Sequence, residues 1–162
     1  MLLSFSSFPK QESGIYLSVT DYRNNKLAYE TNSRIRLNNS LVNESYITVI
    51  QNGEKKKLNK TDVYGYMDAD KKVYRFCKGG EYLVAETGDA FLYTQIEKIA
   101  QSKGYKVAIR YFFSKSADSD IFKLTPDNVK EIYGPNGKIP DILDKYLSNS
   151  ATGGSVRHTS FK

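Results

Sequence analysis

Apolar and polar residues alternate with a period of two along much of the chain, which is typical of half-buried β-strands. The longest run of this kind covers residues 105–114. One side of this run consists of Val107, Ile109, Tyr111 and Phe113, and these alternate with Lys106, Ala108, Arg110 and Phe112. The pattern predicts a strand with one apolar face and a second face that is partly covered.

Turn residues between the apolar runs predict hairpins. Asn52-Gly53 stands between YITVI and KKKL, and Asn-Gly favours the type I′ turn that joins paired strands. A second hairpin is predicted over residues 63–77, with its turn at 68–71. Residues 90–100 fit a helix or a strand. A turn at residues 102–104 favours the strand, since it would lead directly into the run at 105–114.

Shorter elements are predicted near both ends of the chain. Strands are expected at residues 14–19 and 34–37, with a short helix capped by Thr20-Asp21 between them. Thr125-Pro126-Asp127 is a strong helix start, and this helix should end at Gly134-Pro135. A further helix is predicted over residues 140–147. The segment 148–162 is rich in Ser, Thr and Gly, which predicts a disordered tail.

These elements predict an α+β fold, with a mainly antiparallel β meander and short C-terminal helices. A partly closed barrel is the alternative arrangement of consecutive hairpins. The 162 residues are enough for one hydrophobic core. We therefore expect a leader or flexible N-terminus at 1–13, a single β-rich domain at 14–147 and the tail at 148–162.

The N-terminal residues Met1 to Phe8 are largely apolar, but no basic residue precedes them and no A-x-A-like cleavage site follows. They are therefore predicted to be an incomplete signal peptide or an irregular start. No stretch approaches the about 18 apolar residues of a transmembrane helix. The sequence predicts a soluble protein.

Composition adds a basic and tyrosine-rich character. The chain has 13 Tyr, 8 Phe and no Trp, and its net charge is +6. Such a charge favours weak attraction to polyanions. The densest cationic run is Lys55, Lys56, Lys57 and Lys60. We interpret it as the solvated edge of a hairpin, with an anion-binding site as the alternative.

Candidate catalytic and metal-binding residues are few. The chain has one cysteine, Cys77, and one histidine, His158, so disulfide frameworks and multi-cysteine metal sites are excluded. Cys77 is predicted to be a buried core thiol, and His158 falls in the predicted tail. The pairs Asp68-x-Asp70 and Asp118-x-Asp120 lack the further ligands of a calcium loop and are predicted turn residues. No cofactor is predicted, and an enzyme is the less favoured class.

Aromatic and basic residues interleave at two places in the predicted sheet. The candidate binding surface consists of Tyr64, Tyr66, Lys71, Lys72, Tyr74, Arg75, Arg110 and Phe112. On an exposed sheet face, such residues stack on bases or sugars while the cations hold phosphates. The alternative is that the aromatic residues form the core and the cations form its solvated back.

Three segments resemble a group of small uncharacterised exported proteins of Bacteroidota. These segments are GIYLSVTDYRNNK, KKLNKTDVYGYMDADKKVYRF and YFFSKSADSDIFKLTPDNVKEIYG. The resemblance covers about residues 14–133. It implies a periplasmic or secreted location, and it assigns no activity to any residue.

Together these observations favour a non-catalytic binding or structural module. It would act through a sheet face or a sheet edge on a protein or glycan partner. Two alternatives stay open, a nucleic-acid or polyanion binder and an enzyme without a sequence signature.

Overall fold

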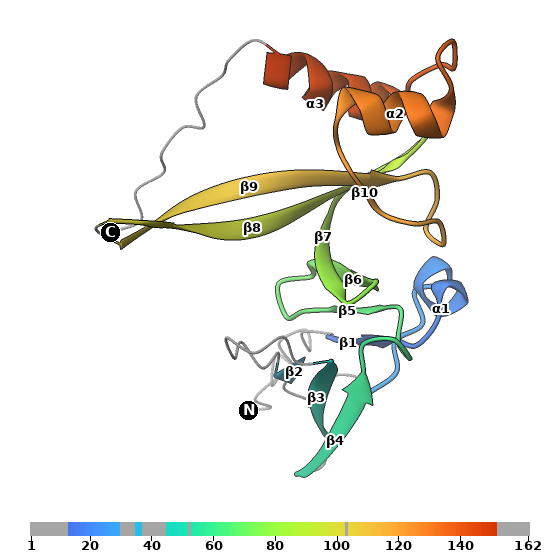
Figure 1. Cartoon of the computed structure of the whole chain (residues 1–162). Coiled ribbons are helices and arrows are strands. Elements are labelled where there is room, and N and C mark those ends of the chain that lie inside the picture. Colours follow the sequence, from blue (N-terminus) through green and yellow to red (C-terminus); the bar gives the residue numbers. More distant parts are fainter. Residues whose placement is uncertain (1–12, 30–34, 37–44, 52, 103, 152–162) are drawn as a thin grey trace, which may run out of the picture. The chain divides into compact units, whose positions relative to one another are not determined.

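The computed structural model describes residues 13–29, 35–36, 45–51, 53–102 and 104–151 (Figure 1). The chain divides into two compact units, Met1–Val84 and Ala85–Lys162, which are described in turn. The predicted leader, apart from Ser13, and the predicted tail beyond Ala151 lie outside the described residues. The predicted bounds of a single domain, 14–147, stay a prediction.

The described strands form two sheets, and the fold is α+β as predicted. The three-stranded sheet has the order β2-β3-β4, with bounds Ile35–Arg36, Tyr46–Gln51 and Glu54–Asn59. The seven-stranded sheet has the order β1-β5-β6-β7-β8-β9-β10 and is mainly antiparallel. Its strands are β1 (Gly14–Tyr16), β5 (Gly65–Met67), β6 (Val73–Cys77), β7 (Gly80–Thr87), β8 (Phe91–Gln101), β9 (Gly104–Ser114) and β10 (Phe122–Lys123). This sheet is open, so the alternative of a partly closed barrel is wrong.

Both predicted hairpins of the first unit are present. β3 pairs with β4 from Tyr46↔Asn59 to Gln51↔Glu54, on either side of the predicted turn. Gly53 has φ +82°, a conformation that glycine adopts without strain. β5 pairs with β6 across the predicted turn at 68–71. The buried core of this unit consists of Ile15, Ile47, Val49, Val63, Tyr66 and Phe76.

Helix α1 (Val19–Arg23) begins earlier than the sequence predicts, because Ser18 is its N-cap and not Thr20-Asp21. The Ser18 side chain accepts a hydrogen bond from the Asp21 backbone N–H, and the Asp21 carboxylate accepts one from the Ser18 backbone N–H. This reciprocal arrangement is a capping box. Asp21 therefore occupies the third helical position and supports the cap from inside the helix.

The second unit contains the longest strands and two helices. β8 and β9 pair over their full length, from Phe91↔Ser114 to Gln101↔Gly104, so the strand prediction for residues 90–100 is confirmed. Helix α2 (Pro126–Tyr133) has the predicted N-cap, Thr125, whose side chain accepts from the Asn128 backbone N–H. Helix α3 (Asp141–Ala151) continues past the predicted end at Leu147.

The core of the second unit lies where the two helices meet the base of the β8–β9 hairpin. Its buried residues are Ala90, Leu92, Phe113, Val129 and Leu143. Helices and strands thus share one apolar cluster, which fixes the hairpin by its base. No helix in the described ranges is long and apolar enough to cross a membrane.

Candidate interaction surface

The residue pairing of the β8–β9 hairpin determines which side chains share a face. Directly paired residues of an antiparallel ladder lie on the same face, and neighbours along a strand lie on opposite faces. Ile96 pairs with Ile109, Lys98 with Val107 and Ala100 with Tyr105. Four large apolar residues therefore lie on one face of the outer part of the hairpin. We call Ile96, Tyr105, Val107 and Ile109 the apolar strip.

The same face is covered at the base of the hairpin. Leu92 and Phe113 pair with each other there and are fully buried in the core beneath the helices. The next position outward is Tyr111, whose ring lies 5.1 Å from that of Tyr146 in α3. The far end of the β8–β9 hairpin extends past the helices (Figure 1).

The apolar strip is exposed. The exposed fractions are 73% for Ile96, 61% for Tyr105, 50% for Val107 and 45% for Ile109. Single exposed apolar residues are common on protein surfaces, whereas contiguous groups mark interaction sites. These four residues are contiguous by register, so the strip is the strongest candidate interaction surface among the described residues.

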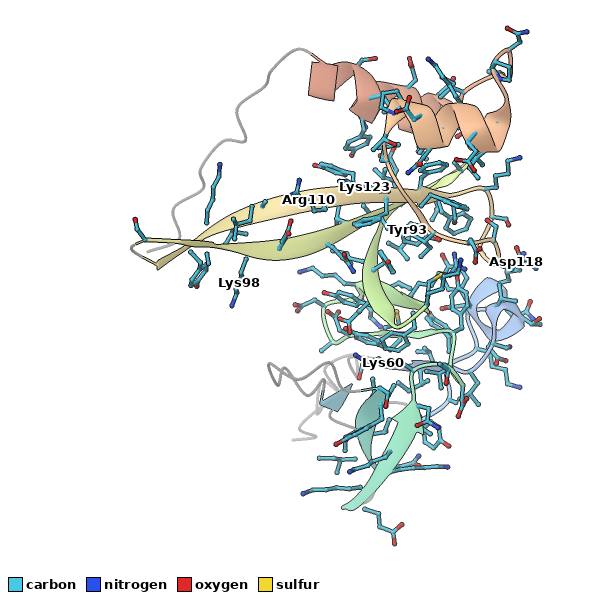
Figure 2. All side chains as sticks on the ribbon, viewed as in Figure 1. Lys60, Tyr93, Lys98, Arg110, Asp118 and Lys123 are labelled. Atoms are coloured by element: carbon cyan, nitrogen blue, oxygen red, sulfur yellow. The ribbon has the colours of Figure 1, made fainter. Side chains whose placement is uncertain are left out.

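Charged groups lie on both faces of the hairpin, and one of them lies beside the strip. The Lys98 ammonium lies 5.0 Å from the centre of the Tyr105 ring, on the face of the strip. Arg110 forms an ion pair with Glu97 on the opposite face. Figure 2 shows Lys98 and Arg110 pointing to opposite sides of the hairpin. The face opposite the strip therefore carries an ion pair, and the strip face has one cation at its side.

The candidate residues that the sequence places in the first unit are partly buried. Tyr66 is buried and stacks on Tyr74, with ring centres 4.7 Å apart. The Tyr66 hydroxyl donates to the Glu81 carboxylate at 3.0 Å. Burial, together with the negative charge of Glu81, raises the pKa of Tyr66 well above its usual range. A buried, hydrogen-bonded tyrosine of this kind is a core residue rather than a stacking platform.

Arg75 is also buried, and its guanidinium lies 5.4 Å from the centre of the Tyr64 ring. The exposed members of the first unit are Lys71 and Lys72, beside the turn between β5 and β6. In the second unit Arg110 is exposed and Phe112 is partly buried. The structure brings Tyr66 together with Tyr74, and Tyr64 together with Arg75. Binding by the eight residues of the candidate binding surface stays a prediction.

Three lysines of the run lie on β4, which is the last strand of its sheet, and Lys60 directly follows this strand. Lys55, Lys56 and Lys57 are exposed, and two of them lie over aromatic rings. The Lys56 ammonium is 4.8 Å from the centre of the Tyr29 ring, and that of Lys57 is 4.3 Å from the Tyr46 ring. Charged side chains at a sheet edge oppose pairing with another chain, which agrees with the predicted solvated edge.

The residues with potential metal or nucleophile chemistry lie apart from one another. Across the described ranges, no group of three or more His, Cys, Asp and Glu side chains could hold a metal ion. Asp68 is a turn residue as predicted, because its carboxylate accepts from the backbone N–H groups of Asp70 and Lys72. Cys77 is only partly buried, at the turn between β6 and β7, so its predicted burial in the core is wrong. His158 lies outside the described residues.

Comparisons with known proteins give no further indication of function. No protein-family model, curated protein or solved structure matches this chain. The resemblance to exported Bacteroidota proteins stays a prediction.

Sequence reasoning identified the apolar face of β9 but not its exposure. The alternation of Val107 and Ile109 with polar residues predicts an inward face, and it does not show where the covering helices end. The lengths of the strands and helices do indicate this exposure. Eleven strand residues span about 36 Å, whereas the 8 residues of α2 span about 12 Å. Short helices therefore leave part of such a hairpin uncovered.

Proposed function

We propose that this chain is a non-catalytic binding module that recognises a protein partner through the apolar strip. One observation carries this proposal: Ile96, Tyr105, Val107 and Ile109 are contiguous on one face and remain exposed. Exposed apolar groups bind partners because contact removes their surface from water.

The composition of the strip favours a protein over a glycan. Three of its four residues are aliphatic, and aliphatic side chains offer no hydrogen-bonding groups to sugar hydroxyls. Protein interfaces combine an apolar centre with a charged rim. Ile96, Val107 and Ile109 resemble such a centre, with Lys98 beside them. The polyanion-binding and enzymatic alternatives stay predictions.

A matched pair of substitutions tests the strip. Ile96→Asp places a charge on the strip, and Ile99→Asp places the same charge on the opposite face of the same strand. Both positions are exposed, so we expect either change to alter the free energy of unfolding by about 0.5 kcal/mol or less. The two variants differ only in which face carries the charge.

The measurement is quantitative affinity capture from extracts of the cells that naturally produce this chain, followed by mass spectrometry. We expect a protein other than this chain to be retained by the wild type and by Ile99→Asp, and to be retained at least ~10-fold less by Ile96→Asp. Equal retention by Ile96→Asp would show that the strip is not the binding surface. Retention by neither the wild type nor the control would contradict the proposal as well.

A further inference from the structure

Along most of the outer edge of β9, the described residues of the second unit show no pairing. β9 lies between β8 and β10, but β10 pairs only with Phe112 and Phe113. The backbone of Leu124 extends this contact by one donor, since its N–H donates to the Tyr111 carbonyl at 2.9 Å. From Gly104 to Arg110 the described chain provides no strand beside this edge.

The direction of the backbone groups along this edge follows from the contact at Tyr111. In an antiparallel ladder, alternate residues direct both their N–H and their C=O groups to the same side of the strand. The Tyr111 carbonyl points away from β8, because it accepts from Leu124. Hence the backbone groups of Tyr105, Val107 and Ile109 also point away from β8. These three residues are the β9 members of the apolar strip, so one set of residues provides both the unpaired edge and the exposed side chains.

We propose that the outer edge of β9 pairs in antiparallel orientation with the same edge of a second copy of this chain, with Val107 on the two-fold axis. In this register Val107 pairs with Val107 of the second copy, and Tyr105 pairs with Ile109. All three outward-facing residues of each copy then exchange hydrogen bonds. Aromatic and β-branched residues form favourable cross-strand pairs. The edge is self-complementary, as a two-fold interface requires.

The charges on β9 select this register. With Val107 on the axis, Lys106 lies opposite Ala108 of the second copy, and Arg110 lies opposite Gly104. An axis at Lys106 would place two lysines opposite each other. An axis at Ala108 would place Lys106 opposite Arg110. It would also require the outward backbone groups of Tyr111, whose carbonyl already accepts from Leu124. Like charges directly opposite destabilise a strand pair, so the register centred on Val107 is the favourable one.

This inference goes beyond the proposed function, because it concerns the edge of β9 and not the face that binds a protein partner. Pairing of two edges places the apolar strips of both copies side by side on one continuous face. The dimer would therefore present a larger apolar surface than one chain does. Ile96 lies on β8, away from the paired edge, so Ile96→Asp tests the strip without changing the edge. Val107 belongs to both, and the edge is therefore tested by the mass of the chain in solution and not by partner capture.

Two proline substitutions at directly paired residues provide the test. Val107 and Lys98 pair at a position where the two strands exchange no hydrogen bonds, so neither proline removes a bond of the hairpin. Val107→Pro removes the N–H that faces the outer edge of β9, whereas Lys98→Pro removes one that faces the β7 side of β8. Strands tolerate proline where the lost N–H faces away from the ladder, as at Val107. Circular dichroism checks that both variants retain their strand content.

Sedimentation equilibrium of the full chain, with a reductant present so that Cys77 forms no disulfide, measures the association. We expect the wild type and Lys98→Pro to reach the mass of two chains, and Val107→Pro to raise the dissociation constant of the dimer at least ~10-fold. A wild type that stays at the mass of one chain would overturn the proposal. So would an unchanged dissociation constant in Val107→Pro, or an equal loss of association in both variants.

Discussion

β4 and β9 are each the second strand of a hairpin, and each has an edge along which the described residues provide no partner strand, on β9 from Gly104 to Arg110. These two edges carry opposite side-chain chemistry. The Lys60 N–H donates to the Ser45 carbonyl at 2.7 Å, and the ladder alternation then places the backbone groups of Lys55 and Lys57 on the side away from β3. On β9 the corresponding edge positions carry Tyr105, Val107 and Ile109. The same backbone geometry is combined with cations in one case and apolar groups in the other.

This difference indicates different uses of the two edges. An unpaired edge offers hydrogen-bonding groups to any other strand, and natural proteins commonly place lysines there to prevent pairing. The β4 edge has this protection, so we interpret it as an edge that stays solvated. On β9 the edge-facing positions 105, 107 and 109 carry no lysine, and Lys106 between them directs its backbone groups toward β8, which is consistent with an edge that pairs.

The largest effect is expected when β9 receives the side-chain chemistry of β4. The double substitution Tyr105→Lys and Val107→Lys places two lysines opposite each other on the proposed axis and removes the apolar contacts. We expect the dissociation constant of the dimer to rise at least ~100-fold, since both the charge repulsion and the lost burial oppose pairing. Sedimentation equilibrium measures this change. A dimer that tolerates both lysines would show that the β9 edge is not its interface.

The reciprocal change should create association at β4. Lys55→Val with Lys57→Val removes the two cations at edge-facing positions of β4. We expect self-association of the chain to strengthen at least ~10-fold, because an unprotected edge strand pairs with copies of itself. Lys56→Val is the matched control, since the backbone groups of Lys56 are directed toward Val49 of β3. Equal association of the control and the double variant would contradict the role assigned to edge direction.

A smaller effect is expected on the stability of the core that holds β3, and it does not involve the edge of β4. Tyr66 packs in one core cluster with Ile47 and Val49 of β3, and burial raises its pKa. The unfolded chain releases the Tyr66 proton near pH 10, while the folded chain retains it. Stability is therefore full below about pH 10 and falls as the pH rises further, by up to about 1.4 kcal/mol per pH unit for this residue.

Urea unfolding at pH 9, 10 and 11, followed by circular dichroism, measures this fall. We expect Tyr66→Phe to lose less stability between pH 9 and pH 11 than the wild type, although it lacks the hydrogen bond to Glu81 at every pH. An identical pH dependence in the two proteins would show that the proton of Tyr66 does not contribute.

Local sequence signals predicted most elements of the fold, because turns and helix caps depend on a few adjacent residues. Gly53 adopts the positive φ that the Asn-Gly pair predicts, and Thr125 caps α2 as its position before proline predicts. The start of α1 was missed because Ser18 and Asp21 form a reciprocal cap, which is recognised only when both residues are considered together.

The candidate interaction surface could be predicted only in part. Alternation identified Val107 and Ile109 as members of one apolar face, but their exposure depends on how far α2 and α3 reach along the hairpin. Tyr66 and Arg75 were predicted on a binding surface, and the alternative placed the aromatic residues in the core and the cations on its solvated back. The structure buries both side chains, so Arg75 does not lie on a solvated back. Periodicity assigns residues to a face, and only the packing of other elements determines whether that face is covered.

Amide hydrogen exchange of the wild-type chain, resolved by residue and repeated at low and high protein concentration, tests the pairing of the β9 edge most directly. Lys106 and Ala108 direct their N–H groups toward β8, so their exchange should be slow at both concentrations. We predict that the N–H groups of Tyr105, Val107 and Ile109 exchange fast at low concentration and slowly at high concentration, because only the second copy protects them. Fast exchange of these three amides at every concentration would contradict the account, and so would protection that does not depend on concentration.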